Sequence, residues 1–237
     1  MTNKQNNNVI LFISDLHAPY HHKDSIAFLA KIKETYKPTR IVNVGDEVDY
    51  HALSFHDSDP DLDSAGVELI RAQATIQQLE KIFPVMDLIH SNHGSMVYRR
   101  GKAAGMPRHV LKPYNEVLGV GDGWVWHRHL TIDLPDSAPI YVCHGSRKNS
   151  EVYAKQLGCN VVQGHYHEDF RLGFYNSPRG IIWGMNIGCL IDDEELAFEY
   201  NKVNPLRPIL GSALVVNGIP RLIPMNVDSK GNWDGKV

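Results

Sequence analysis

The chain has 237 residues, of which 43% are hydrophobic and 22% are charged, and its formal net charge at pH 7 is −3. These values suit one domain with a sizeable core, and they argue against a protein that coats long nucleic acid. The three cysteines include no Cys-x-x-Cys pair, so we expect neither a disulfide framework nor a thiolate zinc site, and the cytoplasm is the expected compartment. The chain has no long apolar run and no apolar segment near its start, so we expect neither a membrane span nor a signal peptide.

Short apolar runs alternate with helical spacing in the first half of the chain. Runs rich in β-branched residues are typical of strands buried on both faces, whereas apolar residues three and four positions apart are typical of helices. The pattern predicts, in chain order, a strand at 9–13, a helix at 24–36, a strand at 40–44, a helix at 64–83 and a strand at 85–90. Asp24 is the expected N-cap of the first helix. The expected buried side of the second helix contains Val67, Ile70, Ala74 and Leu79.

The second half of the chain has shorter apolar runs separated by turn residues. Residues 98–117 are expected to be helical in part, and a helix is predicted at 150–157. Mostly antiparallel strands are predicted at 124–126, 130–134, 140–143, 161–162, 170–174, 181–187, 213–216 and 221–225.

The two halves together predict an α/β fold in which two sheets pack face to face and helices lie outside. No linker or repeat divides the chain. We therefore expect a flexible N-terminal tail at 1–8, a single domain at 9–225 and a loose C-terminal tail at 226–237.

Five short polar motifs each follow directly on a predicted strand. Ligands in open α/β sheets gather beyond the carboxyl ends of the strands, so strand ends that meet at one edge would bring all five motifs together. The motifs are Asp15-Leu16-His17, Gly45-Asp46-Glu47-Val48-Asp49, Ser91-Asn92-His93-Gly94, His144-Gly145 and Gly164-His165-Tyr166-His167.

These motifs supply two Asp, one Asn and four or five His, which is a ligand set large enough for two divalent cations. Each motif alone also occurs in plain turns, and only their combination in order at strand ends favours a metal site. Nitrogen and oxygen ligands without sulfur suit Mn, Fe, Zn, Co or Ni better than a pure Ca or Mg cage. Two neighbouring cations activate water and hold an ester during in-line displacement, so the sequence predicts a metal-dependent phosphoesterase.

The set of motifs resembles the calcineurin-like metallophosphoesterase superfamily, whose pattern is D-x-H, G-D-x-x-D, G-N-H-[D/E], H and G-H-x-H. The resemblance covers the chain from about Val9 to Val216. It implies a four-layer α-β-β-α sandwich of two mixed sheets with a dinuclear metal site at the carboxyl ends of the strands. Residues 15–22 and the arginine pair after Asn-His resemble the sequences of the family branch that is common in bacteriophage genomes. If the protein is phage-encoded, this resemblance implies that it is located in the host cytoplasm.

The resemblance also implies a role for each matching residue. It places Asp15, His17, Asp46 and His167 on one metal, and Asp46, Asn92, His144 and His165 on the other, with Asp46 bridging. His93 is then the catalytic histidine that faces the substrate without binding metal. Asp49 is an outer carboxylate that orients a ligand or the backbone of its own loop.

Two positions depart from the family pattern. Ser91 stands where the family usually has Gly, and Gly94 stands where it usually has Asp or Glu. In many relatives that carboxylate pairs with the catalytic histidine, so His93 needs another partner here or relies on the phosphate itself. Asp57 and Glu47 are candidate acids that could take the place of that carboxylate.

Basic residues near the metal motifs are candidates for substrate binding. Arg147 and Lys148 follow His144 and are the better candidates for contact with a substrate phosphate, with no such contact an equal alternative. Arg99 belongs to a basic stretch after Asn-His that could meet a second phosphate or a nucleic-acid backbone, although a solvated helix face is the favoured explanation. The acidic 50–64 segment counts against long DNA as substrate. The histidines expected on the surface are His21, His22, His51 and His56.

Three functions remain open from the sequence. The favoured one is a phosphodiesterase that acts on nucleotides or nucleic-acid ends, with manganese as the favoured metal. The second is a phosphomonoesterase that acts on a phosphoprotein or a small phosphate. The third is a non-catalytic metal-binding interaction module, for which Gly94 is the only support. The oligomeric state is open.

Overall fold

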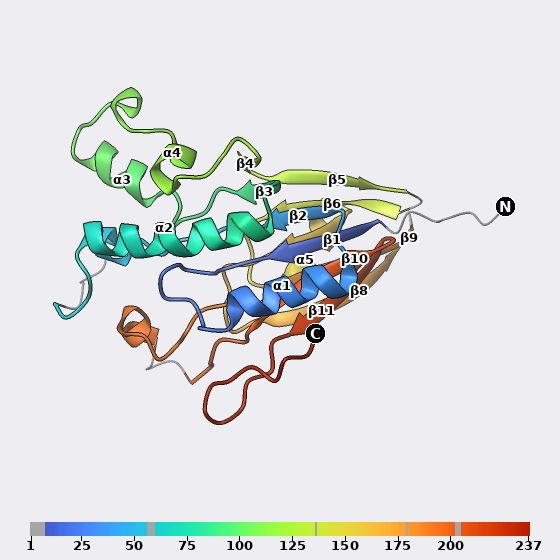
Figure 1. Cartoon of the computed structure of the whole chain (residues 1–237). Helices are drawn as coiled ribbons and strands as arrows, with labels where there is room; N and C mark the ends of the chain where they lie inside the picture. The colour runs from blue at the N-terminus through green and yellow to red at the C-terminus, as the bar shows by residue number, and fades with distance from the viewer. Residues whose placement is uncertain (1–7, 56–59, 136, 179, 202–204) are drawn as a thin grey trace.

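The computed structural model describes residues 8–55, 60–135, 137–178, 180–201 and 205–237. The chain forms an α/β fold with two mixed β-sheets and flanking helices (Figure 1). The elements of the first half are β1 (Val9–Ile13), α1 (Ser25–Tyr36), β2 (Arg40–Asn43), the 3-10 turn η1 (His51–Leu53), α2 (Ala65–Ile82), β3 (Met86–Ile89), α3 (Met96–Ala103), η2 (Arg108–Val110) and α4 (Tyr114–Leu118). Those of the second half are β4 (Trp124–His127), β5 (Leu130–Leu134), β6 (Ser137–Cys143), α5 (Ser150–Leu157), β7 (Asn160–Gln163), β8 (Phe170–Ser177), β9 (Gly180–Ile187), η3 (Leu196–Asn201), β10 (Gly211–Val216) and β11 (Ile219–Pro224).

One sheet has six strands in the order β11-β10-β1-β2-β3-β4, and the other has five in the order β5-β6-β7-β9-β8. Strands β1 to β4 are parallel to one another, and so are β6, β7 and β9. The antiparallel pairs lie toward the margins of the sheets, at β1–β10, β10–β11, β5–β6 and β8–β9. After residue 119 the expected antiparallel pairing holds for these four pairs, whereas β3–β4, β6–β7 and β7–β9 are parallel, because crossovers such as α5 between β6 and β7 return the chain in the same direction.

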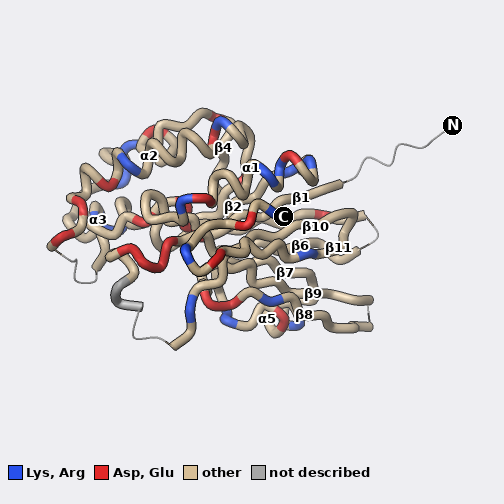
Figure 2. Tube along the Cα trace, turned by 60° about the horizontal axis from the view of Figure 1, so that its bottom comes forward, with Lys and Arg blue, Asp and Glu red and all other residues tan. Residues whose placement is uncertain are grey.

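The alternating side chains of β1 show how the layers form. Leu11 and Ile13 point to one face of the first sheet and pack with residues of α1 and α2. Ile10 and Phe12 point to the other face and pack against β6, β7 and β9 of the second sheet. Helix α5 covers the far side of that sheet through Ala154. The result is the four-layer α-β-β-α order, with α1 and α2 on one side of the strands and α5 on the other (Figure 2).

Helix α2 buries a different face from the one that its sequence indicates. Val67 and Ile70 are 46% and 69% exposed, and the buried residues are Glu68, Ala72, Thr75, Ile76 and Leu79. The reason is the Glu68 carboxylate, which accepts the backbone N–H groups of His51 at 2.7 Å and Ala52 at 2.9 Å. This contact turns the helix so that a polar residue faces inward and supports η1.

Residues 226–237 are docked on α1, which corrects the expectation of a loose tail. The Trp233 ring meets Phe28 edge-to-face with centroids 5.6 Å apart. The Trp233 backbone N–H donates to Asp24 Oδ2 at 3.1 Å, so Asp24 holds this segment and makes no side-chain cap to its own helix. A partly buried aromatic ring and a backbone hydrogen bond thus tie this polar segment to the rest of the fold. No helix among the described residues is long and apolar enough to cross a membrane.

Candidate metal centre

The five polar motifs lie beyond the ends of five parallel strands, three in one sheet and two in the other. Asp15, Asp46 and Asn92 follow β1, β2 and β3, which are neighbours in the first sheet. His144 and His165 follow β6 and β7, which are neighbours in the second. Because the inner faces of the two sheets share one core, their strand ends open onto the same site.

The loops that carry these side chains hold unusual backbone conformations. Asp15, His17, Asp46 and His165 all have positive φ, between 50° and 69°. Such conformations are uncommon outside glycine and cost about 1–3 kcal/mol each where the chain is forced into them. Backbone hydrogen bonds lock the first two loops together, with His17 N–H donating to Asp46 O at 2.8 Å. Strain concentrated on candidate ligands indicates a functional site.

Two glycines allow the loops to approach one another. Gly45 has φ of 112°, and a Cβ there would lie 2.6 Å from His144 Nδ1. A Cβ at Gly164 would lie 1.8 Å from Ser14 Oγ and 2.3 Å from Asp15 Oδ2. Neither position accepts a side chain without moving a candidate ligand.

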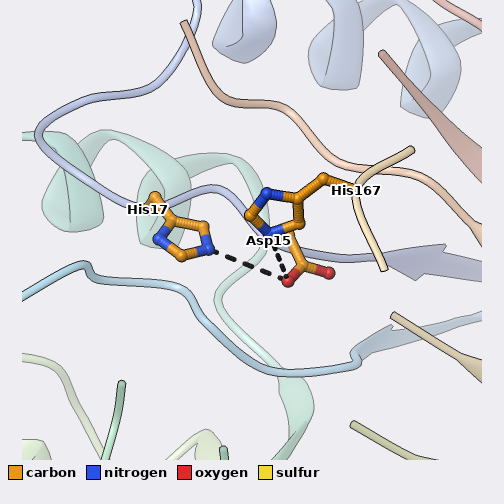
Figure 3. A group of neighbouring side chains, drawn as sticks. All are labelled: Asp15, His17 and His167. Atoms are coloured by element: carbon orange, nitrogen blue, oxygen red, sulfur yellow. Dashed lines mark hydrogen bonds and ion pairs between the residues drawn. The ribbon is translucent and has the colours of Figure 1, made fainter. Parts of the chain in front are cut away.

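Asp15, His17 and His167 form the first group of converging side chains (Figure 3). His167 Nε2 lies 3.1 Å from Asp15 Oδ1, and His17 Nε2 lies 3.8 Å from the same oxygen. Their ligand atoms all lie within 4.8 Å of one another. Residues 150 positions apart in the sequence thus face one small volume.

Asp46, His144 and His165 form the second group, with ligand atoms again within 4.8 Å of one another. Asn92 belongs beside them, because its Oδ1 lies 2.9 Å from His144 Nε2. Asp46 Oδ2 lies 3.0 Å from His144 Nε2 and 3.6 Å from His17 Nε2, which belongs to the first group. The Asp46 carboxylate therefore stands between the two groups, where a bridging ligand would have to be.

The chemistry of the donor set fits divalent cations. His17 Nε2 is buried and has no hydrogen-bond partner among the described residues, although it faces Asp15 and Asp46. The carboxylates of Asp15, Asp46 and Asp49 are at most 1% exposed, and none forms an ion pair with Lys or Arg in the described part of the chain. Buried negative charge without a cationic partner is costly, and a bound cation would remove that cost.

The carboxylates also raise the pKa values of two candidate ligand histidines. Burial alone would lower the pKa of His17, but the neighbouring carboxylates of Asp15 and Asp49 outweigh burial and raise the pKa to about 10. Burial is likewise outweighed at His144, where the Asp46 carboxylate raises the pKa to about 9. The site therefore stabilises positive charge, which is the electrostatic environment that a divalent cation needs.

Asp49 contacts both a candidate ligand and the candidate catalytic histidine. Its Oδ1 lies 2.5 Å from His17 Nδ1 and 3.3 Å from His93 Nδ1, and the His93 Nδ1–H also donates to the Asp49 backbone carbonyl. Asp49 thus supplies the carboxylate that Gly94 does not. Glu47 is directed elsewhere, since it accepts a hydrogen bond from Trp126 Nε1 at 3.1 Å. Asp57 lies outside the described residues.

Ser91 has a specific place in the site. Its Oγ accepts the backbone N–H of Asp46 at 3.0 Å and that of Gly94 at 3.1 Å. The His93 N–H in turn donates to Asp46 Oδ1 at 3.1 Å. The serine hydroxyl therefore joins the Asp46 loop to the Asn-His loop, a contact that Gly at this position would not make.

A cleft of about 330 Å³ opens beside the two groups. Asp46, Asn92, His93, His165 and His167 form its inner wall. The rest of its lining, which we call the outer wall, comprises His51, Ser54, Phe55, Met96, Arg99, Ile191, Phe198, Leu206, Arg207 and Pro208 with the acids Glu168 and Asp193.

Of the three basic residues expected to meet substrate, only Arg99 lines this cleft. Arg147 and Lys148 do not line it, and Lys148 Nζ is paired with Glu168 Oε1 at 2.7 Å. Sequence reasoning missed Arg207, which comes from a segment with no recognisable motif. It also placed His51 on the surface, whereas this residue is buried at the cleft beside Glu68. His22 is buried too.

Neither a protein-family model nor a curated protein matches the chain. Among solved structures, the chain is similar to Vps29 from Chaetomium thermophilum, with 13% identity and a TM-score of 0.48 over 96% of this chain and 94% of that one. It is also similar to YfcE, a phosphoesterase from E. coli, with 12% identity and a TM-score of 0.48 over 97% of this chain and 98% of that one. Vacuolar Protein Sorting 29 from Cryptosporidium parvum shares 15% identity, with a TM-score of 0.42 over 91% of this chain and 95% of that one.

Proposed function

We propose that the protein is a metal-dependent phosphoesterase that holds two divalent cations at the strand ends. The position of the Asp46 carboxylate carries the proposal, because its Oδ2 lies 3.0 Å from a histidine of one group and 3.6 Å from a histidine of the other. In this proposal Asp15, His17, Asp46 and His167 hold one cation. Asp46, Asn92, His144 and His165 hold the other.

The chemistry that such a pair of cations supplies is activation of water and neutralisation of charge on a phosphate. The protein supplies the geometry. Asp49 accepts the Nδ1–H of His17, which fixes the tautomer and leaves His17 Nε2 free as a ligand atom. Asp46 Oδ1 accepts the His93 backbone N–H and so fixes the distance between the metal site and His93.

His93 is the proposed catalytic residue. Its Nδ1–H is committed to Asp49, so Nε2 is the ring nitrogen available to a substrate in the cleft. From there it would donate a hydrogen bond or a proton to the leaving oxygen of the ester. Asp49 Oδ1, which lies 3.3 Å from His93 Nδ1, would hold the ring in the orientation that this role requires.

We favour a phosphodiester over a phosphomonoester as substrate. The support is the outer wall of the cleft, where Phe55, Leu206 and Pro208 offer apolar surface for a second ester group beyond the phosphate. A phosphomonoesterase and a non-catalytic metal-binding module remain the alternatives. Manganese remains the favoured metal, and Fe, Zn, Co and Ni are open; a phage origin and a cytoplasmic location also stay predictions.

The test compares two chromogenic esters with Mn²⁺ and the other candidate metals. Preference for bis-p-nitrophenyl phosphate over p-nitrophenyl phosphate supports the diesterase, and the reverse preference supports the monoesterase. His93→Ala should keep its metals and lose turnover by about 100- to 10,000-fold. His109→Ala, which removes an exposed histidine away from the cleft, should leave turnover unchanged. No hydrolysis of either ester with any metal would leave the binding module as the better account.

A further inference from the structure

The outer wall of the cleft combines apolar surface with two arginines, Arg99 and Arg207. Phe55 is 50% exposed and Leu206 is 56% exposed, although each lines the cleft. The guanidinium of Arg99 lies 5.1 Å from the centroid of the Phe55 ring, and that of Arg100 lies 4.0 Å from it. Arg207 lines the same cavity from a segment more than 100 residues away in the sequence.

The two cleft arginines are not neutralised by the protein. Among the described residues, neither Arg99 nor Arg207 forms an ion pair with a carboxylate, and the hydrogen bond of Arg99 goes to the Asn92 backbone carbonyl at 3.5 Å. Several basic side chains elsewhere in the described chain are paired with acids, as at Arg40–Asp87, Arg71–Asp63, Lys148–Glu168 and Arg171–Asp169. A guanidinium that has no carboxylate partner and lies in a cleft beside a proposed phosphate site is well placed to bind a phosphoryl oxygen.

The hydrogen bond of Arg99 locates one of these guanidinium groups relative to the metal site. Asn92 is a proposed ligand, so the Arg99 guanidinium contacts the backbone of a residue whose side chain faces the place where the reacting phosphate would be held. A second phosphoryl group attached to the first would therefore reach this arginine. Arg207, on the same cavity, can meet that group from another side.

The cleft is a poor match for a nucleic-acid strand. Its volume of about 330 Å³ is near the lower end of the range of small-ligand sites, about 300–1,000 Å³. Asp193 lines it, and Asp192, Glu194 and Glu195 continue that acidic run. A run of carboxylates at the cleft would repel the successive phosphates of a strand.

We infer that the cleft binds a small organic diphosphate of the nucleoside diphosphate class, with one phosphoryl group at the metal site and the next held by Arg99 and Arg207. The organic group then lies against the apolar wall formed by Phe55 and Leu206. This inference rests on the proposed function, because it places the reacting phosphate at the two metal groups.

Binding without turnover tests the inference separately from catalysis. Calorimetric titration of the Mn²⁺-loaded protein would compare α,β-methylene-ADP, which has two linked phosphoryl groups, with AMP, which has one. We expect the diphosphate to bind at least about tenfold more tightly, as a charge-assisted contact provides. Arg99→Ala and Arg207→Ala should each remove most of that preference and leave AMP binding within about threefold. Arg221→Ala, which removes an exposed arginine of β11 away from the cleft, should change neither.

Several results would overturn the inference. These are equal binding of the two ligands, no binding of the diphosphate, equal losses for both ligands in the arginine variants, or tighter binding of a ten-residue oligothymidylate than of the diphosphate. Hydrolysis of bis-p-nitrophenyl phosphate, measured on the same samples, reports on the proposed function. A protein that hydrolyses this ester but shows no arginine-dependent preference retains the function and loses the substrate class.

Discussion

Replacement of Asp49 is expected to weaken metal binding even though Asp49 is not a proposed ligand. The carboxylate lies 2.5 Å from His17 Nδ1 and so holds the His17 tautomer in which Nε2 is free. A buried hydrogen bond of this kind contributes about 1.5–3 kcal/mol, and 1.4 kcal/mol corresponds to a factor of ten in affinity. Asp49→Ala should therefore lower the affinity for Mn²⁺ by about 10- to 100-fold. Asp49→Asn, which keeps an acceptor oxygen, should lose less.

Calorimetric titration with Mn²⁺ at fixed pH measures this effect, with circular dichroism to show that each variant is folded. Asp87→Ala is the matched control, because Asp87 also pairs with a histidine, His127, at 2.8 Å but lies outside the site. It should bind Mn²⁺ like the wild type. Unchanged affinity in Asp49→Ala, or an equal loss in Asp87→Ala, would refute the role assigned to Asp49.

Three further predictions follow from the geometry. Asp46→Asn should lose both metal and ester hydrolysis, as measured by elemental analysis and turnover; full occupancy would contradict the bridging position. Gly45→Ala should cost more than about 2 kcal/mol in urea denaturation and weaken metal binding, since its φ is 112° and its Cβ would lie 2.6 Å from His144 Nδ1. Burial raises the pKa of Glu68 from 4.5 to about 7, so the folded protein keeps a proton on this carboxyl that the unfolded chain releases above about pH 4.5. The free energy of unfolding should therefore be highest below about pH 4.5 and should fall by at most about 3 kcal/mol as the pH rises through about 7. Glu68→Gln should flatten this dependence, and an unchanged pH profile of unfolding would contradict it.

The convergence of the strand-end side chains could be predicted from the sequence because each position is fixed by local pattern. The apolar run of β1 and the helical spacing of α5 gave the observed bounds, and parallel strands place their carboxyl ends at the same edge. Asp15, Asp46 and His144 therefore converge as their positions after strands indicate. What each one binds remains a proposal.

Contacts between distant segments could not be predicted in this way. Periodicity shows that α2 has apolar residues, but the buried face is decided by Glu68, whose partners His51 and Ala52 belong to another segment. Glu47 and Asp57 were the expected partners of His93, and the observed partner is Asp49, from the same segment after β2, because Glu47 accepts a hydrogen bond from Trp126 instead. Arg207 has no motif around it, and only the folded chain brings it to the cleft.

The most direct measurement is a crystal structure of the protein with Mn²⁺, in which anomalous scattering locates the metal. We predict two peaks about 3.5–4 Å apart, one on each side of the Asp46 carboxylate, with His17 Nε2 and His144 Nε2 directed at different peaks. A single peak, no peak, or peaks away from Asp46 would contradict the dinuclear site on which the proposed function depends.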